Sequence, residues 1–171
     1  MNKYLIETER LYLHQFTLDD VQALLPILGD ADVMQFSIDG PLTAEQIEHL
    51  LTTRYIKCYE EHGFGRMAVI DKSTNKLIGF CGISYQEIDG EQMLEIGYRF
   101  AKQYWGKGYA TEAGLAVKEY ARDVLKLPQF LAIIEPANTQ SIRVAQKIGM
   151  SLWKPSMFHG KVVHLYRIVF E

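Results

Sequence analysis

The sequence predicts an α+β fold, built as a single domain that spans residues 1–171. First, 48% of the 171 residues are hydrophobic, which is enough apolar material for one compact core. Second, no Pro/Gly/Ser-rich linker, low-complexity tract or internal repeat marks a domain boundary. Third, runs of strand composition are interspersed with stretches whose apolar residues recur at helical spacing, so both kinds of element are expected.

The first half of the chain is expected to contain a strand, two helices and an antiparallel hairpin. The strand is predicted at 11–16, the helices at 17–28 and 43–62, and the hairpin strands at 64–70 and 77–85 around the polar turn 71–75. Thr17 and Thr43 suit helix N-caps, and a glycine follows each helix. Asp20 and Gln46, each three residues after its cap, strengthen both assignments.

The second half is expected to alternate strands with helices. Strands are predicted at 93–100 and 130–134, helices at 109–125 and 138–148, and two terminal strands around the turn His159-Gly160, the second within 162–170. The run 130–134 is nearly all apolar, which is typical of a strand buried on both faces.

Composition excludes several classes of function. The net charge is -3 with a pI near 6.0 and no block of like charge, so neither a nucleic-acid partner nor a membrane is expected. Glu7 and Glu9 stand where a signal peptide would be apolar, which favours a cytoplasmic protein. Cys58 and Cys81 are interpreted as small buried hydrophobes, and the five histidines lack ligand spacing, so no metal site is expected.

A segment with two glycines, 103–110, carries the strongest chemical signal. Gly106 and Gly108 lie between a predicted strand and the first turn of a predicted helix, where free backbone N–H groups and the helix dipole attract a phosphate. A Walker A loop does not fit because Lys107 lies between the glycines, and Thr111 replaces the third small residue of a dinucleotide fingerprint. A tight turn without a ligand explains the glycines equally well.

A second segment, Asn138-x-x-Ser141, opens the next helix, and together the segments carry a family resemblance. Gln103-x-x-Gly106-x-Gly108 resembles the acetyl-CoA pyrophosphate loop of GNAT acetyltransferases. Asn138-x-x-Ser141 with Lys147-x-Gly149 resembles their second CoA segment. The residues that place the chain near the ribosomal-protein alanine and serine N-acetyltransferases are 7–13, 19–20, 32–34, 95–98 and 105–113. His14 and Met150 depart from many relatives, which bears on substrate or packing.

The resemblance implies a twisted, mixed and mostly antiparallel sheet flanked by helices, an α/β three-layer arrangement. Two neighbouring parallel strands, 93–100 and 130–134, would splay apart to admit the pantetheine arm of acetyl-CoA. Its amides would pair with backbone groups near Phe100. The backbone N–H groups expected to hold the pyrophosphate belong to Gly106, Lys107, Gly108, Tyr109 and Ala110.

Two side chains are candidates for catalysis under the same resemblance. Glu95 is the candidate general base, acting through a water molecule, and a cross-strand salt bridge is its alternative role. Ser141 is the candidate acid that protonates the departing thiolate, and helix capping is its alternative. Asn138 would order the wall of the cofactor site. Direct transfer is expected because Cys58 and Cys81 lie outside both CoA segments.

The expected acceptor is a primary amine, either a protein N-terminus such as that of a ribosomal protein or a small molecule. By resemblance, segments 32–34 and 43–58 form the acceptor side, and Met34, Phe36, Asp39 and Glu45 suit a cationic amine. The main alternative is a module of the same fold that binds acyl-CoA without catalysis, and a P-loop nucleotide binder is a third reading. Monomer and homodimer are both compatible with the sequence.

Overall fold

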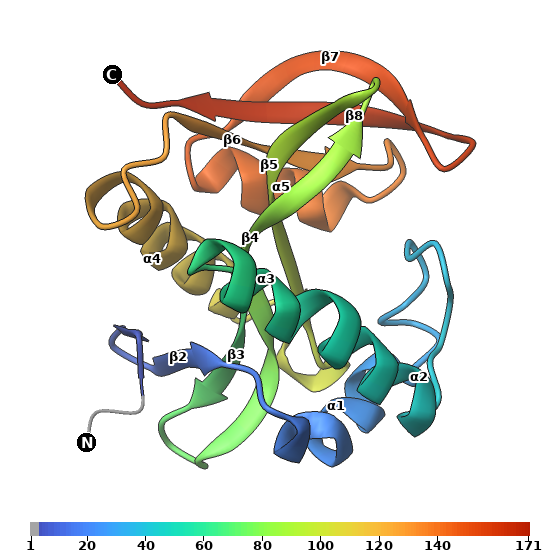
Figure 1. Ribbon diagram of the computed structural model, residues 1–171, viewed down its shortest axis with the longest axis vertical. Coiled ribbons are helices and arrows are strands. Elements are labelled where there is room, and N and C mark those ends of the chain that lie inside the picture. The colour runs from blue at the N-terminus through green and yellow to red at the C-terminus, as the bar shows by residue number, and fades with distance from the viewer. Residues whose placement is uncertain (1–3) are drawn as a thin grey trace.

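A single mixed sheet organises the protein, seen in Figure 1 as a computed structural model that describes residues 4–171. Its eight strands in this region follow the order β1-β2-β3-β4-β5-β6-β8-β7. The strands are β1 Ile6–Glu7, β2 Leu11–Gln15, β3 Arg66–Asp71, β4 Lys76–Ile88, β5 Glu91–Phe100, β6 Gln129–Ile134, β7 Ser151–Phe158 and β8 Lys161–Val169. Every neighbouring pair is antiparallel except β5 and β6. The mixed, mostly antiparallel sheet predicted from the sequence is confirmed.

Helices cover both faces of this sheet. They are η1 Leu18–Asp20, α1 Val21–Leu28, α2 Ala44–Leu50, η2 Leu51–Tyr55, α3 Ile56–His62, η3 Lys102–Tyr104, α4 Tyr109–Asp123 and α5 Thr139–Lys147. Met67 and Val69 pack in the core beneath α4 and α5, whereas the intervening Ala68 packs in the core beneath α1 and α2. The two faces alternate along the strand as pleated geometry requires, and the result is three layers.

The parallel pair separates almost as soon as it forms. Glu95 and Leu131 are the one registered pair between β5 and β6, whereas β4 and β5 keep register from Gly79 and Phe100 to Ile88 and Glu91. Backbone groups of β5 beyond Glu95 that face β6 are therefore free of a ladder. The splay implied by the family resemblance is present, and it opens the middle of the sheet.

The predicted helix 43–62 is interrupted by a π-helical turn, η2. Thr43 and Gln46 form the expected capping box, and Gly63 ends the segment with a left-handed φ of 78°. At its centre the hydroxyls of Thr52 and Thr53 donate to carbonyls four residues earlier, at 2.9 and 2.7 Å. Such bonds compete with the regular ladder, and π turns concentrate at functional sites.

Several boundaries differ from the predicted ones because turns fix them locally. Asp89 and Gly90 adopt φ of 53° and 80°, which allows a two-residue turn, so β4 runs on to Ile88 and β5 begins at Glu91. The short strand β1 was not predicted, since its charged sequence shows no alternation. No helix within residues 4–171 has the length and apolar character to cross a membrane.

Candidate active site

The loop before α4 has the geometry of an anion site made by the backbone. Gly106 and Gly108 have φ of 70° and 81°, and Gly108 is the N-cap of α4 without any side-chain cap. A Cβ at Gly106 would meet nothing within 4 Å, and one at Gly108 would approach only the Arg10 guanidinium, at 3.4 Å. Glycine is therefore required by the left-handed backbone, while the space above the loop stays open. The residues present fit a diphosphate bound by first-turn N–H groups.

An N-terminal segment braces this loop, which sequence reasoning missed. Glu112 in the first turn of α4 accepts hydrogen bonds from the Thr8 hydroxyl at 2.6 Å and from Arg10 Nε at 2.6 Å. Arg10 also donates to the Lys107 carbonyl at 3.0 Å and stacks on Tyr109. Burial alone would raise the pKa of Glu112, but these hydrogen bonds outweigh it and lower that pKa. The sequence motif Thr8-Glu9-Arg10 contains the residues of this contact. It did not predict their role, because their partner, Glu112, lies far away in the sequence.

The loop is also tied to the end of β5. The indole Nε1 of Trp105 donates to the carbonyl of Phe100 at 2.9 Å. Phe100 itself is buried, so it reaches a ligand through its backbone alone. Its carbonyl retains a second lone pair, which keeps the predicted contact with a pantetheine amide open. The structure thus gives Trp105 a positioning role between loop and strand.

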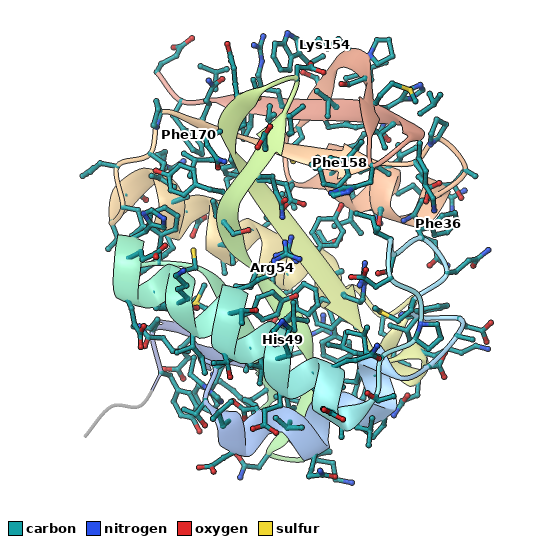
Figure 2. All side chains as sticks on the ribbon, turned by 45° about the vertical axis from the view of Figure 1, so that its right-hand side comes forward. Phe36, His49, Arg54, Lys154, Phe158 and Phe170 are labelled. Atoms are coloured by element: carbon teal, nitrogen blue, oxygen red, sulfur yellow. The ribbon has the colours of Figure 1, made fainter. Side chains whose placement is uncertain are left out.

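A cavity of about 380 Å³ occupies the gap beyond the point where β5 and β6 part. It contains Glu95, Asn138 and Ser141 in its lining, so the structure brings these three predicted residues together. Phe100 and residues 106–110 are outside this lining. Figure 2 shows three further wall residues: Phe36 from the loop after α1, Arg54 from η2 and Phe158 from β7. The cavity therefore reaches from the α1–α2 side of the protein to the terminal hairpin.

Glu95 is held in this cavity by a buried ion pair. Arg66 donates to Glu95 Oε2 at 2.8 Å and to the Tyr55 hydroxyl at 3.2 Å. A Cβ at Gly97 would lie 2.6 Å from the same guanidinium, so glycine at this position makes room for it. Burial would lower the pKa of Arg66, but Glu95 and Tyr55 more than compensate and raise it. The salt bridge anticipated as an alternative role for Glu95 exists, and its partner comes from β3, two strands away.

Glu95 keeps one oxygen available. All hydrogen bonds that it accepts from the described residues go to Oε2, and the side chain lines the cavity. Oε1 can accordingly accept a proton or a water hydrogen bond from a bound molecule.

The start of α5 separates the roles of Asn138 and Ser141. Asn138 Oδ1 accepts from the Ser141 backbone N–H at 3.3 Å, so Asn138 supplies the cap. The Ser141 hydroxyl does no capping, although its residue lines the cavity. Tyr98 on β5 donates its hydroxyl to the Ser141 carbonyl at 2.7 Å, and burial raises the pKa of this phenol. Tyr98 thereby fixes the helix to the strand across the gap.

The two cysteines are poor nucleophiles. Cys81 is buried, which raises its pKa to about 12, and burial also raises the pKa of the half-buried Cys58. Thiols in this state carry almost no thiolate near neutral pH. Within residues 4–171 no three His, Cys, Asp or Glu side chains are grouped so that they would hold a metal ion.

The residues predicted for the acceptor side are brought together only in part. Met34, Phe36 and Asp39 line the cavity, but Glu45 does not. Arg54 and Arg99 also line it, and neither was singled out in the sequence. Arg54 reaches the wall because η2 presents consecutive residues, Arg54 and Tyr55, to the cavity.

Comparison with known proteins identifies this arrangement. The family described as Acetyltransferase (GNAT) domain matches residues 10–151. The chain belongs to the GNAT acetyltransferase family. It is 32% identical over 145 residues to YnaD of Bacillus subtilis, named an uncharacterized N-acetyltransferase, which covers 85% of this chain and 81% of YnaD. It is 41% identical over 108 residues to YkkB of the same species, covering 62% of this chain and 63% of YkkB, which is less than two thirds of that protein.

Solved structures of other proteins share the whole fold. An acetyltransferase of the GNAT family from Bacillus anthracis has 29% identity and a TM-score of 0.80, covering 96% of this chain and 97% of that one. A putative ribosomal-protein-serine acetyltransferase from Vibrio cholerae has 20% identity and a TM-score of 0.78, with 96% of each chain covered. AAC(6')-Ib, solved with Parmomycin and AcetylCoA, has 13% identity and a TM-score of 0.78, with 94% of each chain covered. The family and its relatives establish an N-acetyltransferase, and the latter two structures show the fold alone.

Proposed function

We propose that this GNAT enzyme moves an acetyl group from acetyl-CoA to a primary amine by direct transfer, on a protein N-terminus or a small molecule. The observation that carries the proposal is the placement of two sites around one gap. An open loop with two left-handed glycines precedes α4, and a cavity with an available carboxylate oxygen begins where β5 and β6 part. Bound acetyl-CoA would supply an activated thioester carbonyl.

The loop and β5 bind and orient. Backbone N–H groups of residues 106–110 would hold the diphosphate, and Arg10 keeps the loop in place through the Lys107 carbonyl. The β5 backbone between Ile96 and Phe100 has no ladder with β6, so it is free to pair with the amides of the pantetheine arm. Affinity on this side then comes mainly from main-chain groups.

Glu95 accepts the proton of the amine, directly or through a water molecule. An N-terminal amine has a pKa of about 8 and a lysine-like amine about 10, so most of it is protonated near neutral pH and cannot attack. Arg66 holds Oε2, which leaves Oε1 of this cavity-lining residue without a hydrogen bond to the described residues and available for proton transfer. The ion pair with Arg66 is thus compatible with a role of Glu95 as general base, because it orients the carboxylate.

Ser141 donates a proton to the departing thiolate and regains one from the nitrogen of the tetrahedral intermediate as the amide forms. A thiol has a pKa of about 8.5, so its thiolate is a moderate base that a hydroxyl can assist by hydrogen bonding. The Ser141 hydroxyl is not needed for the cap, which Asn138 makes, and Tyr98 fixes the backbone of Ser141. A covalent acyl-enzyme is not part of this scheme, because burial keeps both cysteine thiols protonated.

An acceptor screen tests the proposal. The protein would be mixed with acetyl-CoA and either short peptides beginning Ala, Ser or Met or free amines, and CoA release and mass shift would be recorded. We expect acetylation of at least one amine, together with calorimetric binding of CoA. Binding of CoA without turnover on any acceptor would indicate the non-catalytic module, and stabilisation by ATP and magnesium but not by CoA would indicate a nucleotide binder.

A further inference from the structure

Arg99 lines the cavity and has no counterion in the part of the chain that the structure describes. Glu95 and Arg99 of β5 are an even number of residues apart, so their side chains project on the same side of the strand, and both residues line the cavity. Glu95 carries the negative charge there, and Arg66 binds it at 2.8 Å. Among residues 4–171, the hydrogen-bond acceptor for Arg99 is a thioether, the sulfur of Met34, at 3.1 Å from Nη1. Arg99 forms no ion pair within this region.

The environment makes an unpaired guanidinium unfavourable. Arg66 and Arg99 both lie near the Phe80 ring, with guanidinium carbons 5.3 and 5.8 Å from its centroid. Burial and the like charge of Arg66 lower the pKa of Arg99, although Tyr55 and Glu95 partly oppose them. A partly buried charge next to a like charge is stabilised chiefly by an anion, and a thioether is a weak substitute for one.

The other charges of the cavity do not supply this anion. Glu135 lies 3.8 Å from Lys161, with which it is paired across the far wall. Asp39 is exposed on the loop after α1, and Arg54 on η2 is a further exposed cation. The ion pairs Arg66–Glu95 and Lys161–Glu135 are each neutral. The remaining charged residues of the lining are two cations, Arg54 and Arg99, and one anion, Asp39, so the net charge of the cavity is positive.

We propose that Arg99 binds a carboxylate of the acceptor, so that the enzyme selects amines that also carry a carboxylate. This inference rests on the proposed acetyl transfer and narrows its acceptor. The amine would lie toward Glu95 and the carboxylate toward Arg99, four residues further along the same strand. Met34, Phe36 and Phe158 would contact the apolar part of such a molecule. Of the two acidic residues that the sequence suggested for a cationic amine, only Asp39 lines the cavity, and Glu45 lies outside it.

Matched acceptor pairs test this selectivity on the wild-type enzyme. Primary amino acids whose carboxylate lies at increasing distance from the amine, from glycine to 6-aminohexanoate, would be compared with their amides, which keep the chain and lose the carboxylate. Peptides with Asp or Asn in the second position would distinguish a side-chain carboxylate from an α-carboxylate. We expect the acids to exceed their amides in kcat/KM by about ten- to a hundredfold, the usual effect of a hydrogen bond to a charged group. Equal or better rates with the amides, or with spermidine, would overturn the proposal.

The variant Arg99→Met tests the residue itself. We expect it to abolish the preference for acids over their amides, chiefly by raising KM for the acids. Arg122→Met, on the exposed side of α4, is the matched control and should keep the preference. Thermal unfolding and CoA calorimetry would verify that Arg99→Met is folded. A preference that survives in folded Arg99→Met contradicts the assignment.

The outcomes also separate this inference from the proposed function. If amines are acetylated without regard to a carboxylate, acetyl transfer stands and the role of Arg99 falls. If no amine is acetylated, the proposed function fails. Calorimetry of the same amino acids and amides with CoA present then tests whether Arg99 binds a carboxylate. Binding of the acids that Arg99→Met removes supports the carboxylate site, and binding without that preference refutes it.

Discussion

The two parts of the proposed site, the loop before α4 and the cavity between β5 and β6, present different kinds of chemical group. The loop at residues 106–110 presents main-chain N–H groups, and its shape depends on two glycines with positive φ. The cavity in the gap is lined by residues from α1 and the loop after it, α2, η2, β3, β4, β5, β6, α5 and the terminal hairpin. A backbone site of this kind recognises a group common to every reaction of a family, whereas a side-chain site can change its specificity by substitution. This difference explains how one fold serves acceptors as different as those named for its structural neighbours.

The largest expected effect is a loss of turnover when a side chain of the cavity is changed. Glu95→Gln should lower kcat by about 10²- to 10⁴-fold, the range attributed to a general base, and should flatten the acid limb of the pH profile. Steady-state kinetics between pH 5 and 9 would measure both. Acetyl-CoA affinity should change little, which calorimetry would check, because Glu95 lies outside the loop. An unchanged acid limb would move the base to another residue.

A second large effect is expected on the backbone half, in affinity. Gly108→Val should weaken CoA binding by at least about a hundredfold, since a branched residue is strained at φ of 81° and would displace the loop. Gly90→Val is the matched control, because Gly90 has φ of 80° and open space in the β4–β5 turn. Both variants should lose similar stability, yet Gly90→Val should still bind CoA. Wild-type affinity in Gly108→Val would contradict the loop assignment.

A smaller effect should separate capping from catalysis at α5. Ser141→Ala is expected to slow turnover by about tenfold or more with little change in Tm, because its hydroxyl is not part of the cap. Asn138→Ala should instead destabilise the protein by about 1 kcal/mol, the typical value of an N-cap. Thermal denaturation and kinetics of the pair would test this. A wild-type rate in Ser141→Ala would remove it from the mechanism.

The last effect, on stability and its pH dependence, concerns the brace between the N-terminal segment and the loop. Glu112→Gln should destabilise the protein by about 1–2 kcal/mol near pH 7, since it weakens charge-assisted hydrogen bonds from Arg10. The folded-state pKa of Glu112 is lowered, so the stability it contributes is present above the unfolded pKa of about 4.5 and is lost as the pH falls below it. The Tm difference between wild type and variant should therefore shrink on acidification. A difference independent of pH would exclude this electrostatic origin.

Local signals made most of the fold predictable. The capping boxes at Thr17 and Thr43 and the turn at Asp89-Gly90 act within a few residues, so their sequence is enough to place the elements around them. The short strand β1 and the π turn η2 were not predicted. The strand β1 forms because it pairs with β2, and η2 depends on both helical hydrogen bonding and tertiary packing. Neither leaves a periodic pattern in the sequence.

The same division holds within the site. The sequence alone predicted the proposed anion loop, since two glycines before a helix favour its left-handed backbone conformation and the first turn leaves N–H groups free. It also nominated Glu95 and Ser141. Only the tertiary structure decided that Arg66 holds Glu95 and that Arg99 has no counterion among residues 4–171. Those facts depend on distances between side chains from different strands, and no local rule of composition or spacing encodes such distances.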